Sequence, residues 1–82
     1  AGARKQEVEV ARAALALGEA ELELAVAERE RVGALVQQGA ARQDQLDRAE
    51  SQLRVAQAQV TTRRQELALV QEGTRSERIA QA

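Results

Sequence analysis

The sequence predicts an all-α fold, an antiparallel two-helix coiled-coil hairpin with the start of a third helix after Gly73. Three observations predict it. Ala, Leu, Val, Glu, Gln and Arg dominate the chain, and most of these residues favour helix. Apolar residues recur at alternating steps of three and four, which is heptad spacing. Two such runs flank a short break that contains Gly33 and Gly39.

The composition excludes several classes of protein. The 82 residues allow one small domain, and they include no aromatic residue, Met, Cys, His or Pro. A compact globular core is therefore not expected, because aromatic residues and Met supply much of the bulk of such cores. The lack of His and Cys removes the commonest bases, nucleophiles and transition-metal ligands. We expect no enzyme, no catalytic residue, no metal and no cofactor.

The charges are balanced and interleaved. The net charge is −1, and acidic and basic residues alternate, as in Glu28-Arg29-Glu30-Arg31. Nucleic-acid binding would need clustered Lys and Arg, so it is not expected. Such runs are typical of solvated helix faces with some i,i+4 support. No run approaches the length of a transmembrane helix.

The first helix is predicted over about 4–37, roughly 50 Å long. Only Gly18 and Arg29 interrupt its apolar seam, which comprises Val8, Ala11, Leu15, Gly18, Leu22, Ala25, Arg29, Val32 and Val36.

A tip turn is predicted over 38–42. Gly39 can take the left-handed conformation that ends a helix. A second helix is predicted over 43–72, with a seam of Leu46, Ala49, Leu53, Ala56, Val60, Arg63, Leu67 and Val70. Folding the chain at Gly39 sets Val36 against Leu46, Val32 against Ala49, Leu22 against Val60, Leu15 against Leu67, Gly18 against Arg63 and Arg29 against Leu53. At the last pair, Arg29 can lay its methylenes along the seam while its head reaches water.

The second helix is predicted to stop at Gly73. Thr74 then serves as an N-cap, and Glu77, three residues on, completes a capping box. A third helix would therefore begin at about Arg75.

A second, weaker apolar stripe points largely away from the seam. It consists of Val10, Leu17, Leu24, Val55 and Leu69. A helix that is apolar on two faces usually has two neighbours, so these residues are candidates for lateral packing against other copies. The alternative is scattered apolar residues on the surface of an Ala-rich helix.

The tip offers residues for recognition. Arg31 and Leu35 lie four residues apart on one helix face. Arg31 can donate several hydrogen bonds to carbonyls or carboxylates. Alternatively, Leu35 caps the seam and Arg31 is solvated.

From Arg31 to Ala49 the chain resembles the hairpin tip of HlyD-type membrane fusion proteins, the periplasmic adaptor subunits of efflux and secretion systems. Those proteins carry an Arg, a Leu four residues later, a Gly-Ala-x-Ser turn and a Leu-Asp pair. Here these are Arg31, Leu35, Gly39-Ala40-Ala41-Arg42 and Leu46-Asp47. Gly73-Thr74-Arg75-Ser76-Glu77-Arg78-Ile79 also resembles a Gly-x-Arg-x-Glu-x-Ile segment found after the hairpin in some exporters.

The resemblance implies a periplasmic location and a transport role. The adaptor would be anchored at the inner membrane, and would reach its inner-membrane transporter, through regions outside this segment. Its tip would dock on a TolC-like outer-membrane channel, and six adaptors would form a ring. The competing interpretation is a purely structural antiparallel coiled-coil spacer or dimerisation module.

One position departs from that pattern. Arg42 stands where those proteins have Ser, and Arg is a poor N-cap. Either Asp44 caps a slightly shorter helix, or the turn is looser. We expect Arg31 and Leu35 to contact the channel, and Arg42 to make a charge-assisted contact in place of the hydroxyl.

Overall fold

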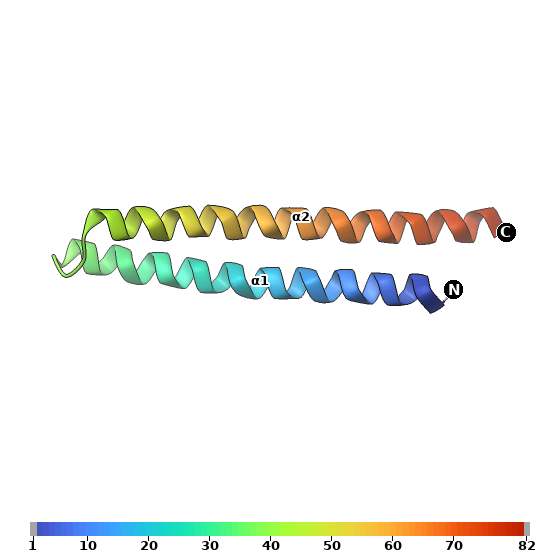
Figure 1. Ribbon diagram of the computed structural model, residues 1–82, viewed down its shortest axis with the longest axis horizontal. Helices are drawn as coiled ribbons and strands as arrows, with labels where there is room; N and C mark the ends of the chain where they lie inside the picture. Colours follow the sequence, from blue (N-terminus) through green and yellow to red (C-terminus); the bar gives the residue numbers. More distant parts are fainter. Residues whose placement is uncertain (1, 82) are drawn as a thin grey trace.

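The chain forms two long antiparallel helices joined by a short turn (Figure 1). The computed structural model describes the backbone of residues 2–81 and the side chains of residues 4–73. Helix α1 spans Gly2–Gln37 and helix α2 spans Gln43–Gln81. The hairpin measures 65 × 15 × 12 Å. The predicted reversal of the chain near Gly39 is therefore confirmed, as are the predicted end of the first helix and start of the second.

The predicted helix end at Gly73 is wrong. Helix α2 continues through Gly73 to Gln81, so no third helix begins there. Glycine inside a helix costs only about 1 kcal/mol relative to alanine, and the chain has no proline to force a break. A left-handed glycine marks many helix ends, and among the described residues Gly39 alone has positive φ. The side chains of Thr74 and Glu77, predicted to form a capping box, lie outside the described residues.

The seam between the helices contains the residues predicted from the heptad spacing. Val32, Ala49, Ala56 and Val60 are the most buried apolar side chains of the described part, and Val60 is 2% exposed. All other predicted seam residues are buried or half-buried, apart from Arg29 and Arg63. A two-helix rod encloses each seam residue from one side only, which explains why most of them remain half-buried.

The pairing along the seam differs in detail from the pairs predicted. Gly18 lies against Arg63 as predicted, but also against Val60: a Cβ on Gly18 would stand 3.8 Å from Arg63 Cγ and 3.6 Å from Val60 Cγ2. Leu46 approaches Gly33, with 3.8 Å between its Cδ1 and a Cβ built there. In a coiled coil each side chain enters a hole formed by several residues of the facing helix. Pairing residues one to one therefore misses contacts such as Gly18 with Val60 and Gly33 with Leu46.

The two arginines in the seam turn their charged ends outward to carboxylates. Arg29 Nη2 lies 3.3 Å from Glu50 Oε2 on the facing helix. Arg63 Nη1 lies 3.0 Å from Glu66 Oε2 on its own helix, while its Cγ packs near Gly18. The head of Arg29, predicted to reach water, thus makes an ion pair between the helices.

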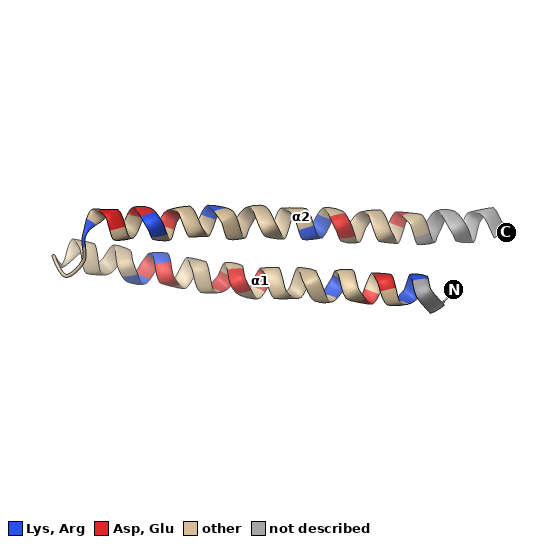
Figure 2. Cartoon of the chain, viewed as in Figure 1, with Lys and Arg blue, Asp and Glu red and all other residues tan. Residues whose placement is uncertain are grey.

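Both signs of charge are distributed along both helices (Figure 2). A further ion pair joins the helices, with Arg64 Nη2 3.6 Å from Glu19 Oε2. Exposed pairs of this kind contribute little each, typically less than about 1 kcal/mol. Over the described residues, neither helix has a stretch apolar enough to cross a lipid bilayer.

Candidate functional site at the hairpin tip

The tip comprises the last two turns of α1, the turn 38–42 and the first turn of α2. Helix α1 ends in a Schellman motif. The N–H of Ala40 donates to the carbonyl of Leu35 at 2.8 Å, and that of Gly39 donates to the carbonyl of Val36 at 3.0 Å. Gly39 has φ +75°, a conformation that costs residues with a Cβ but not glycine. This glycine therefore fixes the place where the chain reverses.

Helix α2 begins with Arg42 as its N-cap residue. The carbonyl of Arg42 accepts hydrogen bonds from the N–H groups of Gln45 and Leu46, at 3.0 and 3.4 Å. In return, the Gln45 side chain accepts the N–H of Arg42 at 2.8 Å. This is one half of a capping box. The other half, in which the cap side chain accepts the N–H of Gln45, cannot form, because a guanidinium has no acceptor. Helix α2 begins at Gln43, so the predicted cap at Asp44 is wrong, while the predicted looser turn stays a prediction.

The side chain of Arg42 lies at the outer end of the tip. It is 79% exposed, and its Nε donates to Asp44 Oδ1 at 3.2 Å. Asp44 stands in the first turn of α2, where its negative charge also complements the helix dipole. A guanidinium has five N–H donors, so one contact to Asp44 leaves Arg42 able to bind a further acceptor.

Arg31 is held by an ion pair within α1. Its Nε and Nη2 donate to the two carboxylate oxygens of Glu28, at 3.1 and 2.5 Å. These hydrogen bonds, and then the attraction of opposite charges, raise the pKa of Arg31 above its usual value. The hydrogen bond from Arg31, helped by the charge of its guanidinium, lowers the pKa of Glu28, and desolvation acts in the opposite direction. The Arg31 side chain remains 60% exposed, so its other donors face solvent.

Leu35 is half-buried, next to the half-buried seam residue Val36. Its backbone carbonyl is the acceptor of the Schellman bond from Ala40, so the backbone at Leu35 is fixed by the turn. Part of its side chain is open to solvent at the end of the rod. Covering this exposed apolar surface with a partner would be favourable, because it removes apolar area from water.

The structure places all three predicted tip residues at one end of the rod, on both sides of the turn. Arg31 and Leu35 lie one turn apart on α1, and Arg42 opens α2. The sequence reasoning missed Gln45, which caps α2, and the Gln43–Asp47 hydrogen bond of 3.0 Å in the first turn. The signal for Gln45 was present, because Glu or Gln three residues after the cap is the second half of a capping box.

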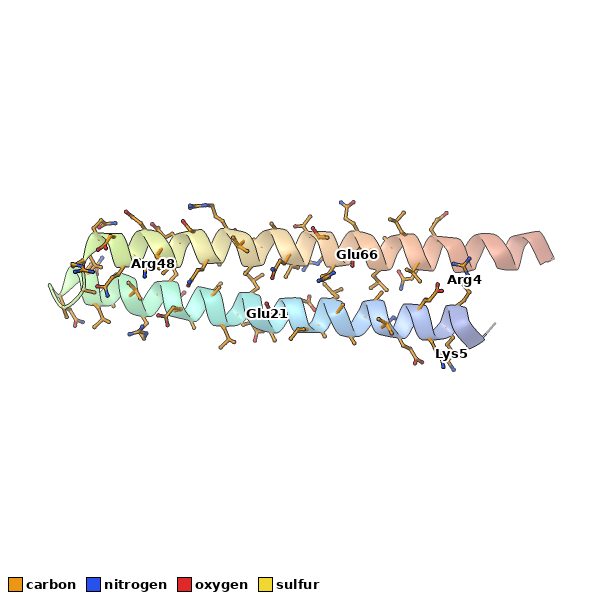
Figure 3. The ribbon with its side chains drawn as sticks, in the orientation of Figure 1. Arg4, Lys5, Glu21, Arg48 and Glu66 are labelled. Carbon is orange, nitrogen blue, oxygen red and sulfur yellow. The ribbon has the colours of Figure 1, made fainter. Side chains whose placement is uncertain are left out.

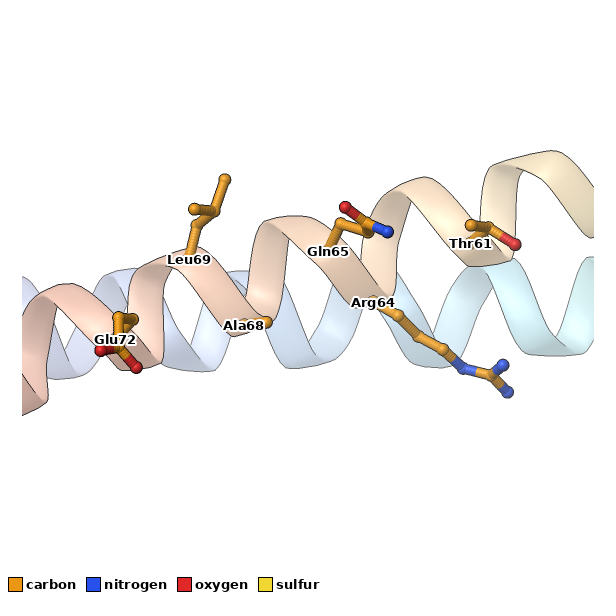
Figure 4. Close-up of a pocket in the computed structure, with 6 residues that line it drawn as sticks. All are labelled: Thr61, Arg64, Gln65, Ala68, Leu69 and Glu72. Atoms are coloured by element: carbon orange, nitrogen blue, oxygen red, sulfur yellow. The ribbon is translucent and has the colours of Figure 1, made fainter.

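The predicted lateral stripe is exposed along the rod. Exposure ranges from 59% to 73% for Val10, Leu17, Leu24, Val55 and Leu69. These residues do not form one site. Leu24 and Val55 line a shallow groove between the helices, whereas Val10 lines another nearer the base. Leu69 lies beside a third groove on α2 and points away from that helix (Figure 4).

Within the described part of the chain, no group of three or more acidic, Cys or His side chains is placed to hold a metal ion. The titratable groups of the tip form ion pairs and caps, as described above. The chemistry that the tip offers is therefore hydrogen bonding from two guanidinium groups beside a partly exposed leucine.

Comparison with known proteins identifies the hairpin. No curated protein and no solved structure matches the chain. The model of one protein family, the YBHG alpha-helical hairpin domain, matches residues 1–82. This hairpin domain is found in periplasmic adaptor and membrane-fusion-like proteins. The predicted HlyD-type membership is a finer assignment and stays a prediction. Since the match covers the whole chain, the protein belongs to the YBHG alpha-helical hairpin domain family.

Proposed function

We propose that this hairpin is the projecting arm of a periplasmic adaptor in an export system, and that its tip docks on a TolC-like outer-membrane channel. Two findings support the proposal. The chain belongs to a family of alpha-helical hairpins, and the hairpin is a narrow rod 65 Å long with a tight turn at one end. A rod of this shape is suited to hold a small recognition surface far from its base.

The observation that carries the proposal is the composition of that end. Arg31 and Arg42 are exposed, and Leu35, one turn from Arg31 on α1, is half-buried. Guanidinium groups bind carboxylates and backbone carbonyls through directed hydrogen bonds. A partly exposed leucine gains by entering an apolar pocket. In this proposal Arg42 takes the part of the Ser that related tips carry.

The remaining parts of the proposal concern the longer protein. The adaptor is periplasmic, is anchored at the inner membrane outside this segment, and contacts an inner-membrane transporter there. Six copies ring the channel, with their tips directed toward it. In this proposal the hairpin catalyses no reaction and serves as a stiff spacer between the two membranes.

Binding of the hairpin to a purified TolC-like channel in detergent tests the proposal. We expect Arg31→Ala, Leu35→Ala and Arg42→Ala each to weaken binding at least about fivefold, because truncation of a residue at the centre of an interface costs more than about 1 kcal/mol. Arg12→Ala is the matched control for the arginines, since Arg12 is exposed on α1 far from the tip. Leu67→Ala is the control for Leu35, because Leu67 is also a half-buried leucine but lies near the other end of the hairpin.

Binding that is equally strong in all three tip variants and both controls would remove the tip as a docking site. In that case the purely structural coiled coil, acting as a spacer or dimerisation module, becomes the better account. The exposed lateral stripe is the observation that favours dimerisation.

A further inference from the structure

Two positions of the seam carry arginine instead of a small or apolar residue. These are Arg29 on α1 and Arg63 on α2. The stem of Arg63 packs on the facing helix, with its Cγ 3.8 Å from a Cβ built on Gly18. The side chains of Arg29 and Arg63 are 44% and 46% exposed, respectively. A polar residue at a seam position weakens a coiled coil and helps to fix how many helices it contains. The two arginines therefore bear on how many helices can share this seam.

The seam is open on two faces of the rod. On one face, two shallow grooves run between the helices, one beside Leu24 and the other beside Val10. These two residues are two heptads apart, so they lie on the same side of α1. Figure 3 shows Arg48 and Glu21 of the first groove nearer the turn, and Glu66 of the second groove nearer the base. The grooves are thus two parts of one face.

One arginine–glutamate pair lies on each face of the seam. Arg63 and Glu66 both line the second groove, and Arg63 Nη1 is 3.0 Å from Glu66 Oε2. Arg29 reaches the other way, with its Nη2 3.3 Å from Glu50 Oε2. Glu50 stands two positions from Gln52, which lines the first groove. Two positions are about 200° around an α-helix, so the Arg29–Glu50 pair lies on the face opposite the grooves.

These pairs occupy the places that an added helix would cover. A rod with half-buried leucines gains by adding a third or fourth helix to its seam, as in helix bundles, because more apolar area leaves water. Here an added helix would also enclose a guanidinium and a carboxylate that now reach solvent, and the loss of their hydration opposes the gain. We infer that Arg29 and Arg63 keep the seam two-stranded, each by setting a charged pair across one open face.

Arg63 also separates the two grooves along the rod. It lines the groove beside Val10 and a smaller hollow that contains Val55, and Val55 belongs to the groove beside Leu24 as well. A helix that reached from Leu24 to Val10 would span about 21 Å of α1, and it would have to cross the Arg63 guanidinium. The inference does not rest on docking at the tip, because the charged pairs oppose a third helix with or without a channel.

Replacing both seam arginines tests the inference by sedimentation equilibrium of the full chain. In the variant Arg29→Leu with Arg63→Leu, we expect the concentration at which half of the chains associate to fall at least about tenfold relative to the wild type. The reason is that each leucine covered on association removes apolar area from water. Arg29→Lys with Arg63→Lys keeps both charges and should behave like the wild type, since lysine also extends its charged end to water.

The variant Arg12→Leu with Arg54→Leu is the matched control. It makes the same change in charge and composition at exposed positions outside the seam, and its association should stay close to that of the wild type. Equal association of the seam leucine variant and this control would overturn the inference, because leucine would then act only as an exposed apolar residue. A lysine variant that associates as strongly as the seam leucine variant would overturn it too.

Thiol labelling shows which surface associates, because the chain has no cysteine of its own. Ala25 is half-buried and lines the first groove, whereas Ala13 is exposed two positions beyond the seam residue Ala11. In the seam leucine variant, raising the protein concentration should slow the labelling of Ala25→Cys several-fold and leave that of Ala13→Cys unchanged. Protection of Ala13→Cys equal to or stronger than that of Ala25→Cys would place the association outside the seam and contradict the inference.

Discussion

At the scale of the residue, the tip is defined by Gly39 and by the side chains of Arg31, Leu35 and Arg42. Gly39 holds the only left-handed backbone among the described residues, and the Schellman bonds around it satisfy carbonyls that the end of α1 would otherwise leave without partners. Gln45 supplies one half of a capping box by accepting the N–H of Arg42, and the guanidinium of Arg42 cannot supply the other half. Arg42 is thereby released from a structural role and can extend into solvent.

Replacing Gly39 by Ala should destabilise the hairpin by about 1–2 kcal/mol, the cost of placing a Cβ in the left-handed region. No atom lies within 4 Å of a Cβ built on Gly39, so backbone strain is the whole penalty. Gly39→Asn is the matched control, because Asn tolerates this conformation better. Urea unfolding followed by circular dichroism measures both. Equal stability of Gly39→Ala and the wild type would contradict a left-handed glycine at the reversal.

The Glu28–Arg31 ion pair should make helix stability weakly dependent on pH. The pKa of Glu28 is lowered in the folded chain, so the folded state binds a proton less readily than the unfolded state. The stabilisation is therefore present above the pKa of the unfolded chain and is lost as the pH falls through the lowered pKa.

Because the pair is exposed, the effect should be small. Comparing urea midpoints at pH 7 and at about pH 3, below the ordinary carboxylate range, should show a larger loss for the wild type than for Glu28→Gln. The same loss in both proteins would show that other carboxylates account for the pH dependence.

At the scale of the element, small residues let two long helices approach closely. Gly18, Ala49 and Ala56 are buried in the seam, and Val60 packs over Gly18. The larger seam residues, such as Leu22 and Leu53, are half-buried, because the two described helices cover each of them from one side only. The helices are therefore held by a narrow line of contacts, supplemented by the ion pairs Arg29–Glu50 and Arg64–Glu19.

Replacing Gly18 by Ala should stabilise the hairpin by up to about 1 kcal/mol, since alanine favours helix more than glycine does. A Cβ at this position would lie 3.6 Å from Val60 Cγ2 and 3.8 Å from Arg63 Cγ, which are ordinary van der Waals distances. The melting temperature should rise by about 4–8 °C for each kcal/mol gained. Gly18→Leu should lower it, because the larger side chain would push the helices apart. A loss of stability in Gly18→Ala would show that the helices are closer than the structure places them.

The sequence predicted the helices, the seam and the reversal because each depends on local signals: heptad spacing, the absence of proline and a glycine after an apolar run. It did not predict the continuation of α2 through Gly73. There a glycine and a capping pattern resemble a helix end, yet the backbone keeps negative φ. The detailed pairing along the seam was also missed, because it depends on how Val60 and Leu46 enter spaces beside Gly18 and Gly33.

At the candidate site, the sequence located Arg31, Leu35 and Arg42 at the tip but not their partners. Arg31 pairs with Glu28, and Arg42 pairs with Asp44. The sequence places other carboxylates near each arginine, so the choice of partner depends on side-chain rotamers that the sequence does not reveal. The capping role of Gln45 was readable from its spacing, but a charged residue at the cap position obscured it.

At the scale of the whole molecule, the chain is a rod in which the two helices close on each other, with the turn at one end. A closed hairpin keeps both outer edges and the tip available to partners. An open or domain-swapped form would use the inner seam to bind another chain instead. The low number of large buried side chains makes this alternative worth a direct measurement.

Pulsed electron spin resonance on a chain labelled at Arg12→Cys and Ala68→Cys provides that measurement. Both positions are exposed, and dilution with an excess of unlabelled chain isolates the distance within one molecule. A closed hairpin, with helix axes about 8–10 Å apart, predicts a distance below about 30 Å between the labels. A continuous helix or a swapped, open chain would separate them by about 80 Å at 1.5 Å per residue, and a distance of that size would contradict the hairpin.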